Sequence, residues 1–60
     1  MVNEEYLTPI EIAKQLKITE RTVYRWLDAG DLRGVKLGRV WRVRRNDLEK
    51  FLTERENSPE

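Results

Sequence analysis

Apolar residues recur every three or four positions in three parts of the chain, and this spacing predicts three short helices. The first is expected over residues 9–16, with an apolar face formed by Ile10, Ile12, Ala13 and Leu16. Thr8 is a good N-cap residue, and Pro9 suits the first helical position because no N–H is needed there. Glu11 can reach back to the cap, which completes a capping box. These signals predict where the helix begins.

The second helix is expected between Thr19, which can cap its first turn, and Gly30, which tolerates the left-handed conformation that ends a helix. Its apolar face contains Val23, Trp26 and Leu27. The opposite face carries Arg21, Arg25 and Asp28, flanked by Thr22 and Tyr24. Charges at this spacing form a solvated face as often as a binding face, so the helix alone leaves both readings open.

Only Lys17 and Ile18 separate the first two helices. Because the connection is so short, the second helix should cross the first at a steep angle, as in a helix-turn-helix unit. Ile18 is expected to fill the corner between them. Two short helices bury little apolar surface on their own, so further elements must close the core.

Segments 35–37 and 41–43 alternate apolar and basic residues around Gly38, which predicts a β-hairpin. A two-residue turn would place Lys36 opposite Trp41 and bury charge. A three-residue loop would instead turn four apolar side chains inward, although such loops usually have glycine last and here it comes first. We favour the three-residue loop, because a slip by one residue exchanges the two faces of the hairpin and would bury charged side chains. This register pairs Leu37 with Trp41 and Val35 with Val43, and it turns outward Lys36, Arg42 and Arg44.

A third helix is expected over residues 47–54, after an N-cap at Asn46. Its apolar residues, which can cover the core, are Leu48, Phe51 and Leu52. The predicted fold is therefore mainly α with a small β-hairpin, in the order α-α-β-β-α. Along the chain we expect a short arm, one domain and a frayed tail, over residues 1–6, 7–54 and 55–60 respectively.

Composition narrows the class of protein. The chain has 60 residues and neither cysteine nor histidine, so neither a disulfide, a metal site nor a cofactor is expected. A chain this short buries only about 60% of the surface that it exposes when unfolded, which predicts modest stability. Apolar runs never exceed two residues, so we expect no membrane span or signal peptide and a cytoplasmic location. No pattern of carboxylates, nucleophiles or glycine-rich loops indicates an enzyme.

Charge is unevenly distributed although the net charge is only +1. Residues 1–20 sum to −2, residues 21–45 to +6 and residues 46–60 to −3. A basic middle between acidic ends is typical of a surface that faces a polyanion. Seven of the eight basic residues in the middle segment are arginine, which suits bidentate contacts to phosphate and guanine.

The pattern of helices and hairpin is contained in two stretches, LTPIEIAKQLKITERTVYRWLDAGDL and VKLGRVWRVRRNDLEKFL. Together they resemble the small winged helix-turn-helix domains of the excisionase family, within the MerR-like group. The resemblance covers the chain from about Leu7 to Leu52. It implies that the second helix, residues 19–29, enters the major groove of double-stranded DNA and that the hairpin, residues 35–43, is a wing against the backbone or the adjacent minor groove.

The resemblance also implies a role for each exposed side chain. Base edges would be met by Arg21, Thr22 and Arg25. Phosphates would be approached by Thr19 and Tyr24. Wing contacts would come from Lys36, Arg39 and Arg42, with Arg44 adding to the basic rim.

Two biological roles fit this resemblance, a recombination directionality factor that assists an integrase and a small transcriptional regulator. In either, the expected setting is the cytoplasm of a bacterium or phage host, on the nucleoid when bound. A second copy on an adjacent site is a further expected partner. Few residues follow Leu52, too few for the dimerising helix of full MerR-type regulators, so no small-molecule effector is expected. The alternative is a protein-interaction module that keeps the fold without reading DNA.

Overall fold

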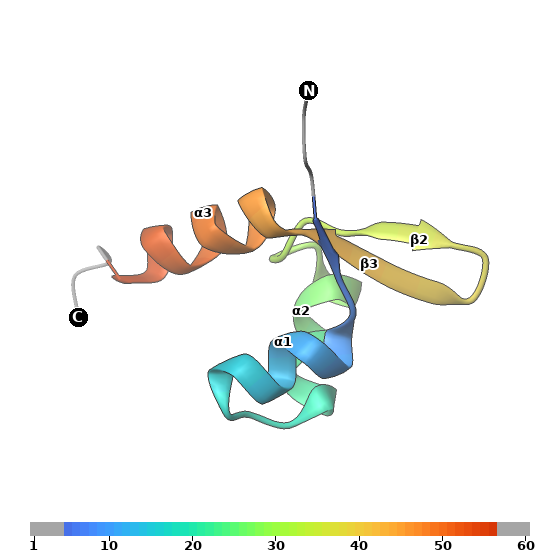
Figure 1. The fold of residues 1–60 in the computed structure, drawn as a ribbon, viewed down its shortest axis with the longest axis horizontal. Coiled ribbons are helices and arrows are strands. Elements are labelled where there is room, and N and C mark those ends of the chain that lie inside the picture. Colours follow the sequence, from blue (N-terminus) through green and yellow to red (C-terminus); the bar gives the residue numbers. More distant parts are fainter. Residues whose placement is uncertain (1–4, 57–60) are drawn as a thin grey trace.

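A computed structural model describes residues 5–56. The fold has three helices and a small antiparallel sheet whose β2–β3 hairpin projects away from them, and the prediction of a winged helix-turn-helix is confirmed (Figure 1). The elements in chain order are β1 Tyr6–Leu7, α1 Pro9–Leu16, α2 Glu20–Ala29, β2 Val35–Leu37, β3 Val40–Arg44 and α3 Arg45–Glu56. Most of the predicted arm and tail lies outside the described residues. No helix in the described part is both long and apolar enough to cross a membrane.

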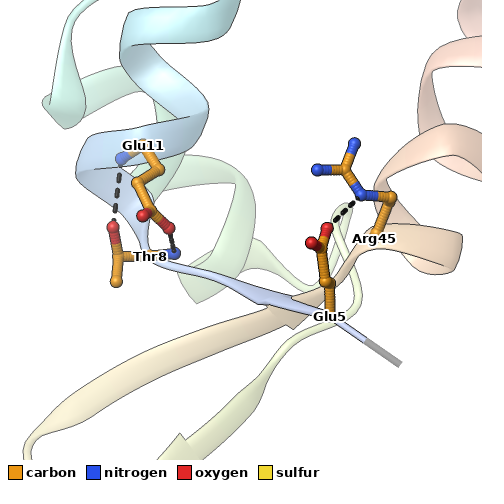
Figure 2. Close-up of polar contacts among 4 residues, drawn as sticks. All are labelled: Glu5, Thr8, Glu11 and Arg45. Atoms are coloured by element: carbon orange, nitrogen blue, oxygen red, sulfur yellow. Dashed lines mark hydrogen bonds and ion pairs between the residues drawn. The ribbon is translucent and has the colours of Figure 1, made fainter. Parts of the chain in front are cut away.

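The capping box at the start of α1 has the predicted geometry (Figure 2). The Glu11 backbone N–H donates to Thr8 Oγ1 at 3.0 Å, and the Thr8 backbone N–H donates to Glu11 Oε1 at 2.9 Å. The bounds of α1 agree with the sequence prediction. Ile10 is the exception to its predicted apolar face, because its side chain is 48% exposed. At about 100° per residue, Ile10 lies more than a third of a turn from the stripe that Ile12 and Leu16 define.

The turn between α1 and α2 is as short as predicted, and it ends α1 without glycine. Lys17 adopts the left-handed conformation, with φ 59°, and the Ile18 N–H donates to the Ala13 carbonyl at 3.0 Å. Thr19 caps α2 and Gly30 ends it at φ 84°, so the predicted bounds of the second helix are confirmed. Ile18 is partly buried against the core, as expected of a corner residue.

The sheet contains one strand that the sequence did not predict. Its order is β1-β3-β2, with Tyr6 opposite Arg44 and Leu7 opposite Val43. A strand of two residues is too short to show a period of two, so β1 carries no signal of its own. It nevertheless buries Leu7 in the core and ties the beginning of the domain to the end of β3.

The predicted hairpin register is wrong. The strands pair Val35 with Arg42, Lys36 with Trp41, and Leu37 with Val40, across a two-residue turn. Gly38 has φ +67° at the first central position, where a two-residue type II′ turn requires a positive φ. Turn chemistry therefore sets the register. Burial of Leu37 does not favour the other register, because the wing projects beyond the helices (Figure 1). The Leu37 side chain is 56% exposed.

The third helix starts earlier and ends later than predicted, and Asn46 lies inside it rather than at its cap. β3 passes directly into α3, and the Arg45 N–H at the junction donates to the Glu5 carbonyl at 2.9 Å. The Arg45 side chain also pairs with the Glu5 carboxylate, Nε to Oε1 at 2.6 Å (Figure 2). The residue before β1 therefore holds the start of α3 through one backbone hydrogen bond and one ion pair.

One core joins all these elements. The buried side chains are Leu7, Ile12, Ala13, Val23, Leu27, Leu32, Val43, Leu48 and Phe51. Leu32, which follows the glycine that ends α2, is among the most buried and had no helical or strand pattern to indicate it. Trp26 and Trp41 pack on this core from its edge, as their positions predict, and the Trp26 ring lies 4.8 Å from that of Phe51 between centroids.

Candidate nucleic-acid interface

The outer face of α2 carries the polar side chains that the helical period placed there. Val23 and Leu27 are buried on the inner face. On the other side Arg21, Arg25 and Asp28 are exposed, Tyr24 is exposed at 38%, and Thr22 is half-buried. A helix that buries one stripe against the core and presents two arginines on the opposite side has the form of a groove-reading element.

Arg21 and Arg25 stand one helical turn apart, and neither makes a hydrogen bond or ion pair within residues 5–56. Two arginines at and within α3 differ. Arg45 pairs with Glu5, and Arg55 lies 3.9 Å from Asp31 and stacks on the Phe51 ring at 4.4 Å. Among the described residues, the guanidinium groups on α2 therefore have donors that no other side chain or carbonyl occupies.

Thr19 and Thr22 are joined at the start of α2. Thr19 Oγ1 accepts from the Thr22 backbone N–H at 3.4 Å, and the two hydroxyls are 3.1 Å apart. The Thr19 oxygen is thus occupied as a cap, while one hydroxyl hydrogen of the pair remains to donate. A phosphate at this helix N-terminus would also meet the favourable end of the helix dipole.

The wing distributes its cations over two faces, so the prediction that Lys36, Arg42 and Arg44 share one outward face is wrong. Lys36 lies opposite Trp41, and its Nζ is 5.5 Å from the centre of the indole ring, on the face that continues into the core. Arg42 and Arg44 alternate with Trp41 along β3 and lie on the other face. The Arg42 side chain is half-buried and donates from Nη1 to the Trp41 carbonyl at 2.9 Å. Arg44 is also engaged in an interaction.

Arg39 occupies the tip of the wing, next to Gly38 in the two-residue turn. Its side chain is exposed and has no partner among residues 5–56. Of the predicted wing residues it is the one whose position depends least on the register, since every pairing considered leaves it in the loop.

A family profile of helix-turn-helix domains matches residues 6–56, which is nearly all of the described chain. The chain belongs to the helix-turn-helix domain family. The family comprises excisionase-like domains, in agreement with the resemblance seen in the sequence, and membership indicates DNA binding. Neither the curated proteins nor the solved structures include a significant match to the chain.

In a helix-turn-helix domain the second helix is the recognition helix, and here it is coupled to the wing at Gly34. A β-carbon added to Gly34 would lie 2.6 Å from Leu27 Cδ2 and 3.1 Å from the Trp41 ring. Leu27 belongs to α2 and Trp41 to β3. The absence of a side chain at Gly34 therefore lets β3 approach α2 closely.

Sequence reasoning left Gly34 unassigned and overlooked Arg33. Arg33 is exposed in the connection between α2 and β2, with no partner among residues 5–56. It lies in no helix or strand, so no periodicity indicated the direction of its side chain. The only available signal was its membership of the basic segment 21–45.

Proposed function

We propose that this helix-turn-helix domain binds specific sequences of double-stranded DNA, with α2 in the major groove and the β2–β3 wing against the flanking backbone. The observation that carries the proposal is the pair of exposed arginines on the outer face of α2, Arg21 and Arg25, which have no partner among residues 5–56. Arginine binds the O6 and N7 atoms of guanine through two parallel hydrogen bonds, and such a contact contributes about 1–3 kcal/mol of discrimination.

The remaining exposed residues have supporting roles in this proposal. Thr22 lies beside Arg25 and contacts a base edge, while Thr19 and Tyr24 donate to phosphates. On the wing, Arg39 at the tip and Lys36, Arg42 and Arg44 on its two faces bind backbone phosphates. Phosphate contacts dominate the affinity and make it fall with salt, and base contacts supply the sequence preference.

The biological role that we propose is that of an excisionase-like recombination directionality factor or a small transcriptional regulator. One small module offers few contacts, so an integrase or a second copy on an adjacent site would add to its affinity. The alternative is a protein-interaction module that keeps the fold and does not read DNA. DNA binding requires the arginines of α2 to contact bases, whereas the protein-interaction module does not.

The deciding experiment compares the protein with the double variant Arg21→Ala plus Arg25→Ala in a selection from a random duplex pool. We expect the variant to lose the sequence preference of the wild-type protein while its circular dichroism is unchanged, since both side chains are exposed. The matched control is Lys14→Ala plus Lys50→Ala, which removes the same charge from exposed positions on α1 and α3. Retention of the motif by the α2 variant would refute the major-groove assignment.

A further inference from the structure

Asp28 lies on the same exposed stripe of α2 as the two arginines. It follows Arg25 by three positions and Arg21 by seven, and these spacings return to one face of a helix. The rise from Arg21 to Asp28 is about 10 Å, at about 1.5 Å per residue. This distance spans about three base-pair steps, since consecutive steps are about 3.4 Å apart. A helix that reads bases with Arg21 and Arg25 thus brings a carboxylate to the same groove.

The position is electrostatically unfavourable for a carboxylate. Asp28 lies in the last turn of α2, where the helix dipole is negative, and this turn contains no basic residue. Within residues 5–56 it forms no ion pair, although Arg25 is close enough in sequence to provide one. On a surface that approaches phosphates, an unpaired negative charge weakens binding to DNA of any sequence.

Four other carboxylates of the described chain are placed more favourably. Glu5 pairs with Arg45, Glu11 completes the capping box, and Asp31 lies beside Arg55. Glu20 lies in the first turn of α2, where the helix dipole favours a negative charge. Asp28 has neither a cation nor a helix N-terminus, and it projects from the recognition face.

We infer that Asp28 is a specificity-determining residue that accepts a hydrogen bond from the exocyclic amino group of a cytosine in the major groove. The inference rests on the proposed function. In that groove cytosine presents only the N4 amino donor, whereas guanine presents two acceptors, thymine an acceptor and a methyl group, and adenine an acceptor beside its donor. A carboxylate therefore favours cytosine, because guanine and thymine present acceptors that repel it and adenine has an acceptor beside its donor. This preference offsets the cost of the carboxylate on a phosphate-facing surface.

Two substitutions at this position test the inference in the same duplex selection. Asp28→Ala removes the acceptor, and we expect the cytosine preference at one position of the motif to fall by about tenfold or more. Asp28→Asn supplies both a donor and an acceptor, a pair that matches the N6 and N7 atoms of adenine, so preference at that position should move from cytosine to adenine. Both variants should bind unselected duplex more tightly than the wild-type protein, because a negative charge has been removed.

The matched control is Glu49→Gln, which removes one negative charge from an exposed position on α3. It should leave the motif unchanged. If Asp28→Ala keeps the wild-type motif at every position, or tightens binding to all sequences equally, the role of Asp28 in specificity is refuted while the proposed function stands. If the wild-type protein binds no duplex even at low salt, the proposed function fails, and the inference fails with it.

Discussion

Single residues in this domain show how far local chemistry can be inferred from sequence. The caps at Thr8, Thr19 and Gly30 were predicted and confirmed, because each depends on only three or four neighbouring residues. The left-handed conformation of Lys17 was not predicted. It follows from the tight turn into α2, which only the assembled pair of helices imposes. A local signal therefore exists where the constraint is local, and it is absent where the constraint comes from packing.

The conformation of Lys17 gives the first prediction. A residue with a β-carbon is disfavoured in the left-handed region, whereas glycine adopts it readily but loses more backbone entropy on folding. Lys17→Gly should therefore raise the free energy of unfolding by about 0.5–1 kcal/mol. Denaturant titration followed by circular dichroism measures the change. Lys17→Ala removes the same charge and keeps the β-carbon, so an equal gain in that variant would show that charge, rather than backbone strain, is responsible.

A substitution at Gly34 is expected to lower the stability of the domain. In Gly34→Ala the new methyl group would meet Leu27 Cδ2 and the Trp41 ring, and overpacking of this kind costs about 1–3 kcal/mol of stability. Thermal unfolding should show a lower melting temperature. Combining Gly34→Ala with Leu27→Ala tests the cause, since Leu27→Ala removes the atom that the methyl group meets. Strictly additive effects of the two substitutions would contradict the proposed close contact.

At the scale of elements, α1 and α2 could be predicted with their bounds, and the hairpin could be predicted as an element, but neither its register nor β1 could. Helical periodicity and caps agree over α1 and α2, so two independent signals support each bound. In the hairpin the two signals conflicted, because burial favoured one register while glycine at the first turn position favoured the other. The structure follows the turn, since the wing is too exposed for burial to compete. The same exposure makes the wing available for contacts outside the domain.

The wing gives a prediction about how DNA affinity depends on salt concentration. Arg39 sits at its tip without a partner among residues 5–56, and in the proposed function it contacts the DNA backbone. Arg39→Ala should weaken binding to selected and unselected duplexes by the same factor. The slope of log affinity against log salt should become shallower by about 0.9 for one lost phosphate contact. Fluorescence anisotropy across a salt series measures both quantities, with Lys50→Ala on α3 as the control. A loss confined to one sequence would instead show that the wing reads bases.

Across the whole molecule, the cations of the candidate interface come from the middle of the chain, between two acidic segments. The net charge hides this division, whereas the segment sums of −2, +6 and −3 reveal it in the sequence. What the sequence could not supply is the distinction between arginines that are occupied and arginines that are available. Arg45 and Arg55 resemble Arg21 and Arg25 in type, and they differ only through neighbours that folding brings to them.

The size of the domain makes its stability a sensitive readout of DNA binding. A ligand that binds only the folded state adds about 2.7 kcal/mol of stability when its free concentration is a hundred times the dissociation constant. In a domain of this length one kcal/mol corresponds to about 4–8 °C in melting temperature. We therefore expect a duplex that carries the selected motif to raise the melting temperature by about 10–20 °C, measured by circular dichroism in the helical region.

A scrambled duplex of equal length and composition separates sequence reading from charge neutralisation. It presents the same phosphates, so it should raise the melting temperature by a smaller amount that disappears as salt is added, because counterion release is its main source of affinity. The motif duplex should keep part of its effect at the same salt concentration, since contacts to base edges are less sensitive to salt. Equal shifts with both duplexes at every salt concentration would show that the recognition helix binds the backbone alone.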